Sequence, residues 1–201
     1  MIALSDFVAD FSKLIESQEK EPWIIIQELD QLIREQIKTL DKEYLIDQGI
    51  AIHKTAVIDP GATIKGPAIL HQNSFVGSNS ILRNGVILMP GARIGTACEI
   101  KSSIVFDQSA IAHFNFIGDS IIGKHVNFEA GSITANHYNE RENKDICVLY
   151  LHQVINTKVQ KFGALVGDYS KIGANAVLSP GTLLTQGSVV NRLELIEQIK
   201  E

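Results

Sequence analysis

The sequence predicts a mainly β protein, a parallel β-helix of hexapeptide repeats with N-terminal helices and a short C-terminal helix. An aliphatic residue or Phe recurs every six positions through two blocks, and the first block slips by one residue twice. These positions are Ile52, Ile58, Ile64, Leu70, Val76, Leu82, Leu88, Ile94, Ile100, Val105, Ile111, Ile117, Ile122 and Phe128, then Val166, Ile172, Leu178, Leu184 and Val190. A period of six is neither the 3.6 of a helix nor the alternation of a strand, and it is the signature of a parallel β-helix.

The spacing also indicates how such a chain becomes stable. Each hexad is expected to form one flat face and a corner, and about three faces complete a coil. A small residue, such as Ala62 or Ser80, follows most aliphatic positions by four places and lets the corner close. Because no coil can bury its own interior, stability comes from stacked neighbours. A β-sandwich with strands of the same spacing is the alternative, and the number of hexads predicts about six coils.

Length and composition agree with one domain and a small appendage. The chain has 201 residues, of which 45% are hydrophobic, and no apolar run is long enough to span a membrane. Asp6 and Asp10 stand where a signal peptide would need basic and apolar residues, so we expect a cytoplasmic protein. The net charge of −5 disfavours nucleic-acid binding. Two cysteines, Cys98 and Cys147, argue against a disulfide framework.

Two helices are expected before the repeat. Ser5 can cap a helix over about residues 6–18, and Pro22 can open a second one that runs to about Leu40. We expect both helices to cover the open first coil, and a partner-docking arm is the alternative. Residues 41–49 then link the helices to the repeat.

The remaining boundaries follow from where the hexads stop. Residues 137–161 break the pattern and are expected to form an inserted loop, with a possible strand over 147–154. The chain therefore divides into an N-terminal helical cap (residues 1–49), a β-helix domain (residues 50–192) and a C-terminal helix (residues 193–201).

One stretch, IAHFNFIGDSIIGKHVNFEAGSITAN at residues 111–136, carries most of the candidate chemistry. It resembles the acetyltransferase half of the bifunctional enzymes that acetylate glucosamine-1-phosphate and then form UDP-N-acetylglucosamine. Their left-handed β-helix has a matching run of His, Gly-Asp, Asn, Ala-Gly and Asn, and the similarity covers roughly residues 50–185. The chain is more similar still to free-standing hexapeptide proteins labelled pyrophosphorylase-like. These contain the motif His-Phe-Asn, then an aromatic and an aliphatic residue, then Gly-Asp-Ser. The resemblance implies a left-handed coil.

The resemblance also implies catalytic roles. His113 falls on the catalytic base, and an imidazole with a pKa of about 6.5 can take a proton from an amine that attacks a thioester. Asn136 and Lys161 fall near the acyl carbonyl, where an amide or a cation can stabilise developing negative charge.

Substrate positions are implied in the same way. Arg83 and Lys101 fall on the contacts to the sugar phosphate, where guanidinium and ammonium groups suit a phosphate. Phe116 and Asn127 fall on further substrate contacts. From the residue types alone, the two cations could instead be solvated surface charges.

Acetyl-CoA is the co-substrate that the resemblance implies. The residues that fall on its lining are Ala130, Asn136, His137 and Ala174. Such sites lie between neighbouring subunits, so we expect a homotrimer. Apolar residues at possible outward positions are candidates for the subunit contact, namely Ile81, Ile87 and Phe114.

Three departures from the family pattern leave a second function open. Phe116 replaces a tyrosine, Glu129 replaces a glycine near the CoA positions, and Ala174 replaces a serine that faces the thiol. These changes, together with the early end of the repeat, suit a non-catalytic protein that binds or senses a sugar phosphate or nucleotide sugar.

A trimeric enzyme with a His-bound metal is the third possibility. His113, His125 and His137 are spaced by twelve residues, whereas stacking on one face needs about 18. The three imidazoles should therefore point from different faces and cannot meet at one zinc ion within a chain. We accordingly expect no metal, and only ligands shared between subunits would change this.

Overall fold

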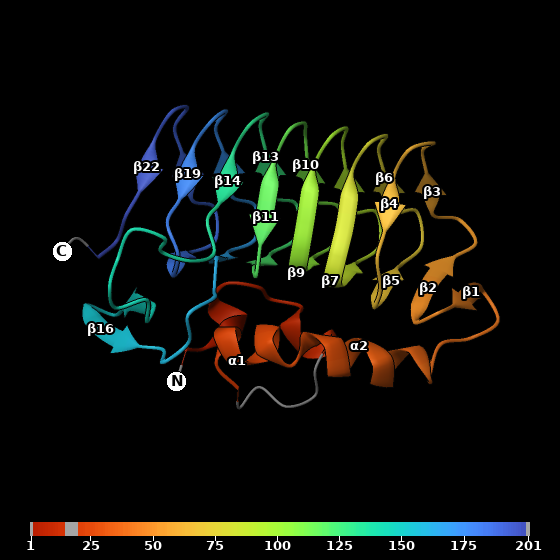
Figure 1. Ribbon diagram of the computed structural model, residues 1–201, viewed down its shortest axis with the longest axis horizontal. Helices are drawn as coiled ribbons and strands as arrows, with labels where there is room; N and C mark the ends of the chain where they lie inside the picture. The colour runs from red at the N-terminus through yellow and green to blue at the C-terminus, as the bar shows by residue number, and fades with distance from the viewer. Residues whose placement is uncertain (1, 15–19, 200–201) are drawn as a thin grey trace.

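The computed structural model describes residues 2–14 and 20–199. Figure 1 shows a row of short strands stacked side by side, with helices along one side. The predicted mainly β fold, a parallel β-helix, is confirmed, because the strands of successive coils pair in parallel. One sheet has seven strands and takes one from each coil. The chain therefore makes seven coils, one more than the sequence predicted.

Three faces, numbered in chain order, form the wall of the β-helix. The first face contains β2 (Ile50–His53), β5 (Ala68–Leu70), the end of β7 (Ile81–Leu88), the end of β9 (Glu99–Val105), β12 (Ile121–Ile122), β17 (Ala164–Val166) and β20 (Thr182–Leu184). The second contains β3 (Val57–Ile58), β6 (Phe75–Val76), β8 (Arg93–Ile94), β10 (Ala110–Ile111), β13 (Asn127–Phe128), β18 (Lys171–Ile172) and β21 (Val189–Val190). The third contains β4 (Thr63–Ile64), the starts of β7 and β9, β11 (Phe116–Gly118), β14 (Ile133–Thr134), β19 (Val177–Leu178) and β22 (Leu195–Ile196).

The two slips of the hexad pattern shorten two corners. Where the hexads are undisturbed, partners are 18 residues apart, as in the pairing of Ile52 with Leu70. Where the intervening chain contains a slip the separation is 17, as in the pairing of Ile104 with Ile121. Both shortened corners join the third face to the first.

The first face is apolar on both sides. Its inward side chains fill the interior of the prism. Its outward side chains are at most 6% exposed: Ala51, Ile69, Ile87, Ile104, Ile121, Leu165 and Leu183. Ile87 was a candidate for subunit contact, and this is wrong because the N-terminal segment covers it.

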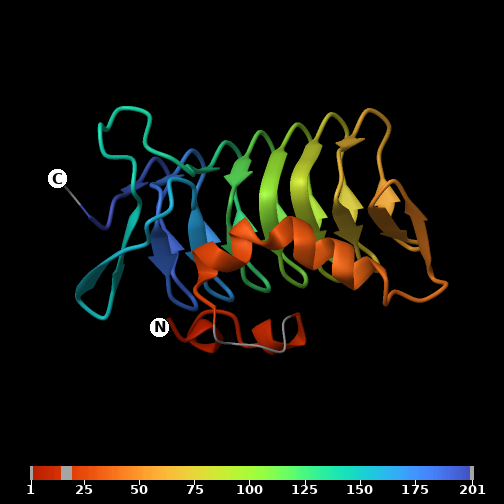
Figure 2. The ribbon, with the colours of Figure 1, turned by 60° about the horizontal axis from the view of Figure 1, so that its bottom comes forward.

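The N-terminal helices run along the first face (Figure 2). They are α1 (Pro22–Gln27) and α2 (Leu29–Ile37), and α2 contacts β5, β7 and β9. The prediction that they cover the open first coil is therefore wrong. The predicted helix over 22–40 is also interrupted, because Glu28 has a non-helical backbone with ψ of 4°.

The segment before α1 forms two 3₁₀ turns, η1 (Leu4–Asp6) and η2 (Phe11–Lys13), in place of the helix predicted over 6–18. Ser5 makes no capping bond, because it lies inside η1. The buried Asp168 holds this segment: its carboxylate accepts the N–H of Ala9 at 3.0 Å and its own N–H donates to Phe7. These backbone groups are therefore not available to a helix. The end of the predicted helix, residues 15–18, lies outside the described residues.

A short strand closes the first coil. The segment predicted as a linker forms β1 (Tyr44–Asp47), which pairs antiparallel with β2. This pairing covers an edge that would otherwise offer its backbone groups to other chains.

The insertion between the fifth and sixth coils forms a hairpin of β15 (Cys147–Tyr150) and β16 (Gln153–Asn156). The single strand predicted over 147–154 is thus two strands. Leu151 and His152 turn the chain between them with positive φ angles of 48° and 63°. Buried residues of the insertion, Ile146, Val148 and Val159, join the hydrophobic cluster of the N-terminal helices.

The predicted C-terminal helix over 193–201 is wrong. Leu195 and Ile196 form β22, which pairs with β19 at the regular spacing of 18 residues. The Gln198 amide then bonds both backbone groups of Leu183, at 2.8 and 2.7 Å. The repeat therefore extends to the end of the described chain, and residues 200–201 lie outside the description.

Replacing Ile87 by Ala tests the double burial of the first face. We expect the free energy of unfolding to fall by about 2–5 kcal/mol, because the smaller side chain leaves a cavity beneath α2. Urea denaturation measures the loss. The matched control is Ile81→Ala on the third face, where the side chain is 37% exposed. An equal loss in both variants would contradict the double burial.

Candidate active site

The densest group of predicted site residues lies at the corner between the third and first faces. The Lys101 ammonium donates to Asp119 Oδ2 over 2.5 Å, and Asn136 Nδ2 donates to the same oxygen. Lys101, Asp119 and Asn136 are 8%, 6% and 7% exposed. One buried carboxylate therefore holds both a cation and an amide. We call these three residues the corner column.

The shortened corners bring the column together. Asp119 follows β11 at the second slip and has a φ of 47°, which Asp tolerates better than most residues. Its N–H donates to the Lys101 carbonyl at 2.8 Å, and its carbonyl accepts from Gly163 at 2.9 Å. Asn136 follows β14 at the same corner of the next coil. The three side chains thus come from the same corner of three successive coils.

Phe116 lies on the third face beside the Asn136 end of the column. The neighbouring Ile117 is buried in the interior, so Phe116 points outward from β11. A Cβ at Gly118 would lie 2.7 Å from the Phe116 ring and 3.0 Å from Asn136 Cγ. The ring therefore folds over Gly118 towards Asn136, and the absence of a side chain at Gly118 allows this.

Arg83 extends the column by one coil. It pairs with Lys101 in the register of β7 and β9. Its guanidinium binds Glu99 Oε1 through Nε at 2.7 Å and Nη2 at 2.6 Å. Both predicted phosphate-binding cations therefore have a carboxylate partner within the chain, and a bound phosphate would share them.

His113 lies at the opposite edge of the third face. It precedes β11, whereas Gly118 at the end of β11 pairs with Lys101. A strand rises about 3.3 Å per residue, so the three residues of β11 span roughly 10 Å. His113 is exposed, and its carbonyl accepts the N–H of Gly131 at 2.8 Å. Within one chain the structure thus joins Lys101 to Asn136 and leaves His113 across the face.

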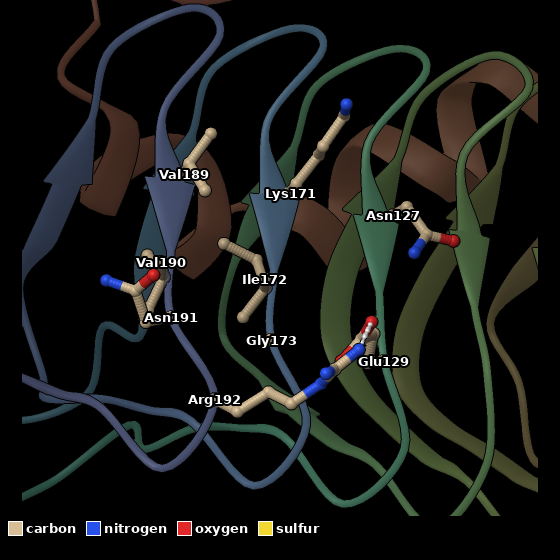
Figure 3. A pocket seen from close by; sticks show the side chains of 9 residues that line it. All are labelled: Asn127, Glu129, Lys171, Ile172, Gly173, Val189, Val190, Asn191 and Arg192. Carbon is tan, nitrogen blue, oxygen red and sulfur yellow. Dashed lines mark hydrogen bonds and ion pairs between the residues drawn. The ribbon is translucent and has the colours of Figure 1, made fainter.

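A groove of about 700 Å³ lies on the second face near the C-terminal coils (Figure 3). Its lining residues are Asn127, Glu129, Lys171, Ile172, Gly173, Val189, Val190, Asn191 and Arg192. Asn127, a predicted substrate contact, pairs in register with Lys171 on the neighbouring strand. The groove therefore offers an amide and an ammonium beside apolar surface.

An ion pair borders this groove. Arg192 donates to both Glu129 carboxylate oxygens, at 2.7 and 2.8 Å, and the Ala174 N–H donates to Oε2 at 2.9 Å. The bonds from Arg192 and then from Ala174 lower the pKa of Glu129 to about 2. The three residues belong to three successive coils, so the pair fastens the C-terminal coils together.

The other predicted residues divide between the two regions. His137 Nδ1 lies 3.2 Å from Asn136 Oδ1. Lys161 is exposed at the end of the insertion, and the residue after it donates its N–H to the Asn136 carbonyl. Ala130 and Ala174 lie at the corner between the second and third faces. The residues predicted to line acetyl-CoA therefore do not form one surface within a chain.

Three polar residues were missed from the sequence. Asp119 had a signal, because it belongs to the Gly-Asp pair of the matching motif and stands at a slip. Glu99 and Arg192 had none, because their partners come from other coils, 16 and 63 residues away.

The three spaced histidines lie at different corners of the prism. His113 precedes the third face, His137 follows it, and His125 stacks on Tyr169 between the first and second faces, with ring centroids 5.1 Å apart. Among residues 2–14 and 20–199, no three His, Cys, Asp or Glu side chains gather as a metal site would require. Nor does this part of the chain contain a helix long and apolar enough to cross a membrane.

Replacing Glu129 by Gln tests the ion pair with Arg192. The carboxyl pKa falls from 4.5 to about 2, so the ionised pair stabilises the fold above pH 4.5 and this contribution is lost as the pH falls through 2. We expect the thermal midpoint of Glu129→Gln to lie below that of the wild type at pH 7 and to approach it near pH 2. Circular dichroism melts across this range measure the difference.

The control for this variant is Glu35→Gln, which removes an exposed ion pair of α2, 2.7 Å long. This variant shows how much of the change in thermal midpoint comes from the change of net charge alone. If the thermal midpoint of Glu129→Gln stays below that of the wild type by the same amount from pH 7 to pH 2, the ion pair does not account for the difference.

The sequence is similar to several known proteins. A family model described as the GMPPB C-terminal domain matches residues 64–160. The chain is 33% identical over 184 residues to a bifunctional sugar-1-phosphate nucleotidylyltransferase/acetyltransferase of Sulfurisphaera tokodaii, covering 86% of this chain and 45% of that protein. It is 32% identical over 181 residues to the bifunctional protein GlmU of Methanococcus maripaludis, covering 88% and 43%.

A solved structure, a hexapeptide transferase family protein from Anaplasma phagocytophilum, aligns with a TM-score of 0.32 and 18% identity over 77% of this chain and 82% of that chain. The chain spans less than half the length of the two bifunctional proteins that it matches. The sequence identity to these two proteins confirms the predicted relationship to the bifunctional GlmU-type proteins.

Proposed function

We propose that the protein transfers an acyl group, most simply acetyl, from acyl-CoA to the amino group of an amino-sugar phosphate or nucleotide sugar. The arrangement of the third face carries this proposal: the cations Arg83 and Lys101 stand at one edge, Phe116 in the middle and His113 at the other edge. The relatives support it, because one is named as an acetyltransferase that also acts on a sugar 1-phosphate.

The amino sugar would lie across the third face. Its phosphate would meet Arg83 and Lys101, its ring would pack near Phe116, and its amine would face His113. The span of roughly 10 Å across β11 suits a hexosamine phosphate placed lengthwise.

His113 would then act as the general base. As the amine attacks the thioester carbonyl, the imidazole takes its proton, a C–N bond forms, the C–S bond breaks, and the CoA sulfur leaves as a thiol after protonation. The exposed position of His113 leaves the ring accessible to an incoming amine.

Asn136 and Lys161 would stabilise the carbonyl oxygen from a second subunit. Within one chain Asn136 lies across the face from His113, so the complete site needs a neighbour whose corner column faces that histidine. We therefore propose a homotrimer, with acyl-CoA passing Ala130 and Ala174 and with no metal. The covered first face leaves the second and third faces for these contacts.

Replacing Phe114 by Asp tests the trimer. Phe114 is 70% exposed beside His113, and its positive φ of 56° is one that Asp tolerates. We expect the variant to dissociate, because a carboxylate would be buried between subunits. Sedimentation should give three times the 22.1 kDa chain mass for the wild type and a lower mass for the variant.

The matched control is Leu151→Asp at the turn of the hairpin. Leu151 is 75% exposed and also has a positive φ, of 48°. It should leave the mass unchanged. A wild type that sediments as a monomer at all concentrations would contradict the trimer.

Replacing His113 by Ala tests the general base. We expect kcat for acetyl transfer to glucosamine-1-phosphate to fall by about 10²–10⁴-fold, with little change in sugar-phosphate affinity. Lys101→Ala should do the reverse and weaken binding. Thiol release measures turnover, and titration calorimetry measures affinity.

His125→Ala is the matched control, because His125 lies at another corner, stacked on Tyr169. Its turnover should equal that of the wild type. Wild-type turnover in His113→Ala would remove His113 from catalysis.

A binding or regulatory protein is the second candidate, and the Glu129 contact favours it. Glu129 occupies the Ala174 N–H, which lies among the residues predicted to line acetyl-CoA. Calorimetry with acetyl-CoA and with glucosamine-1-phosphate, titrated separately, separates the two. Binding of both supports the transferase, whereas binding of the sugar phosphate alone supports the regulator.

A further inference from the structure

We infer that Asp119 is the positioning residue of the site, and that its carboxylate sets the places of both Lys101 and Asn136. This inference rests on the proposed function. It starts from one observation: a single oxygen, Asp119 Oδ2, accepts from the ammonium of one residue and from the amide of the other.

Burial makes this carboxylate necessary for Lys101. The Lys101 side chain is 10% exposed, and its other bond is a long one of 3.5 Å to Ser102 Oγ. A buried ammonium without its carboxylate is strongly disfavoured, so it would turn towards solvent. Asp119 therefore keeps the cation at the edge of the third face, where the sugar phosphate is proposed to bind.

The same carboxylate orients the amide of Asn136. One Nδ2–H points to Asp119, and Oδ1 faces His137 Nδ1 at 3.2 Å. The amide plane is thereby fixed, and the second Nδ2–H remains as the donor for an acyl oxygen. Asp119 thus places Lys101 for the phosphate end of one site and Asn136 for the acyl end of the site that it completes on the neighbouring subunit.

Asp119 is itself held firmly enough to serve this purpose. Its backbone bonds Lys101 on one coil and Gly163 on another, and the Phe116 ring folds over the neighbouring Gly118. Asn can replace Asp at a positive φ with the same shape. Asp119→Asn therefore removes the charge with little change in volume.

The first test compares Asp119→Asn with the wild type. We expect sugar-phosphate affinity by calorimetry and kcat by thiol release each to fall by about 10–100-fold, as when the residue that orients a metal ligand is removed. In the Lys101→Ala background, the substitution should add little to the loss of affinity, because the cation that it places is gone.

A second comparison separates positioning from folding. Lys101→Met leaves the buried carboxylate without its cation, and adding Asp119→Asn removes that charge. The double variant should melt at a higher temperature than Lys101→Met, yet its kcat should be about tenfold lower, because Asn136 has lost its charged acceptor. If Asp119 had only a structural role, adding Asp119→Asn to Lys101→Met would raise the melting temperature and kcat together. That result would overturn the inference. This comparison also holds if Asp119→Asn alone does not fold.

The control variant is Asp10→Asn, which breaks a 2.8 Å ion pair with Lys124 at a different corner, the one between the first and second faces. It should bind and turn over like the wild type. Wild-type affinity and kcat in Asp119→Asn would overturn the inference and leave the proposed function standing. A wild type that neither binds nor acylates an amino-sugar phosphate would overturn both.

Discussion

Parallel pairing between successive coils is the constraint on which the rest of this structure depends. Most strands contain only two or three residues, too few to persist alone, and each gains its backbone partners from the coils on either side. Pairing at 17 or 18 residues brings the inward side chain of one coil over that of the next. The continuous apolar interior follows from this register, and so does the stacking of residues at each corner.

The two slips turn one row of corners into a site. Two successive corners that join the third face to the first each lose a residue, and the polar side chains along this row of corners come into contact across coils. Lys101, Asp119 and Asn136 meet in this way, and the Phe116 ring lies beside Asn136. A buried ion pair contributes little to stability compared with apolar residues of the same size. Its presence here suits a position where a cation must be held for a ligand.

The three faces of the prism have different surroundings. The first is buried beneath the N-terminal segment and the insertion. Phe7 of the N-terminal segment lies near Tyr150 of the insertion, and Trp23 of α1 lies near Phe162 just after it, with ring centroids 6.3 and 6.0 Å apart. The second carries the groove and the Glu129–Arg192 pair. The third carries the proposed substrate surface. Covering one face with the chain's own N-terminus leaves two faces for ligands and for neighbouring subunits.

The sequence by itself determined the fold class and most strands of the seven coils. It could do so because the hexad period fixes which residues point inward, and the slips are visible as spacings of five. It missed β22 and the true cover of the first face, because outward apolar residues look the same whether a helix or a subunit covers them.

Only the tertiary structure decided which charges are paired. Asp119 with Lys101, Glu99 with Arg83 and Arg192 with Glu129 are contacts between coils, and side-chain rotamers, not sequence spacing, select among the possible partners. The structure likewise showed that His113 and Asn136 stand at opposite edges of one face. Because a strand rises about 3.3 Å per residue, a few residues are enough to cross the width of a face. Residues close in the sequence therefore lie at opposite edges of that face.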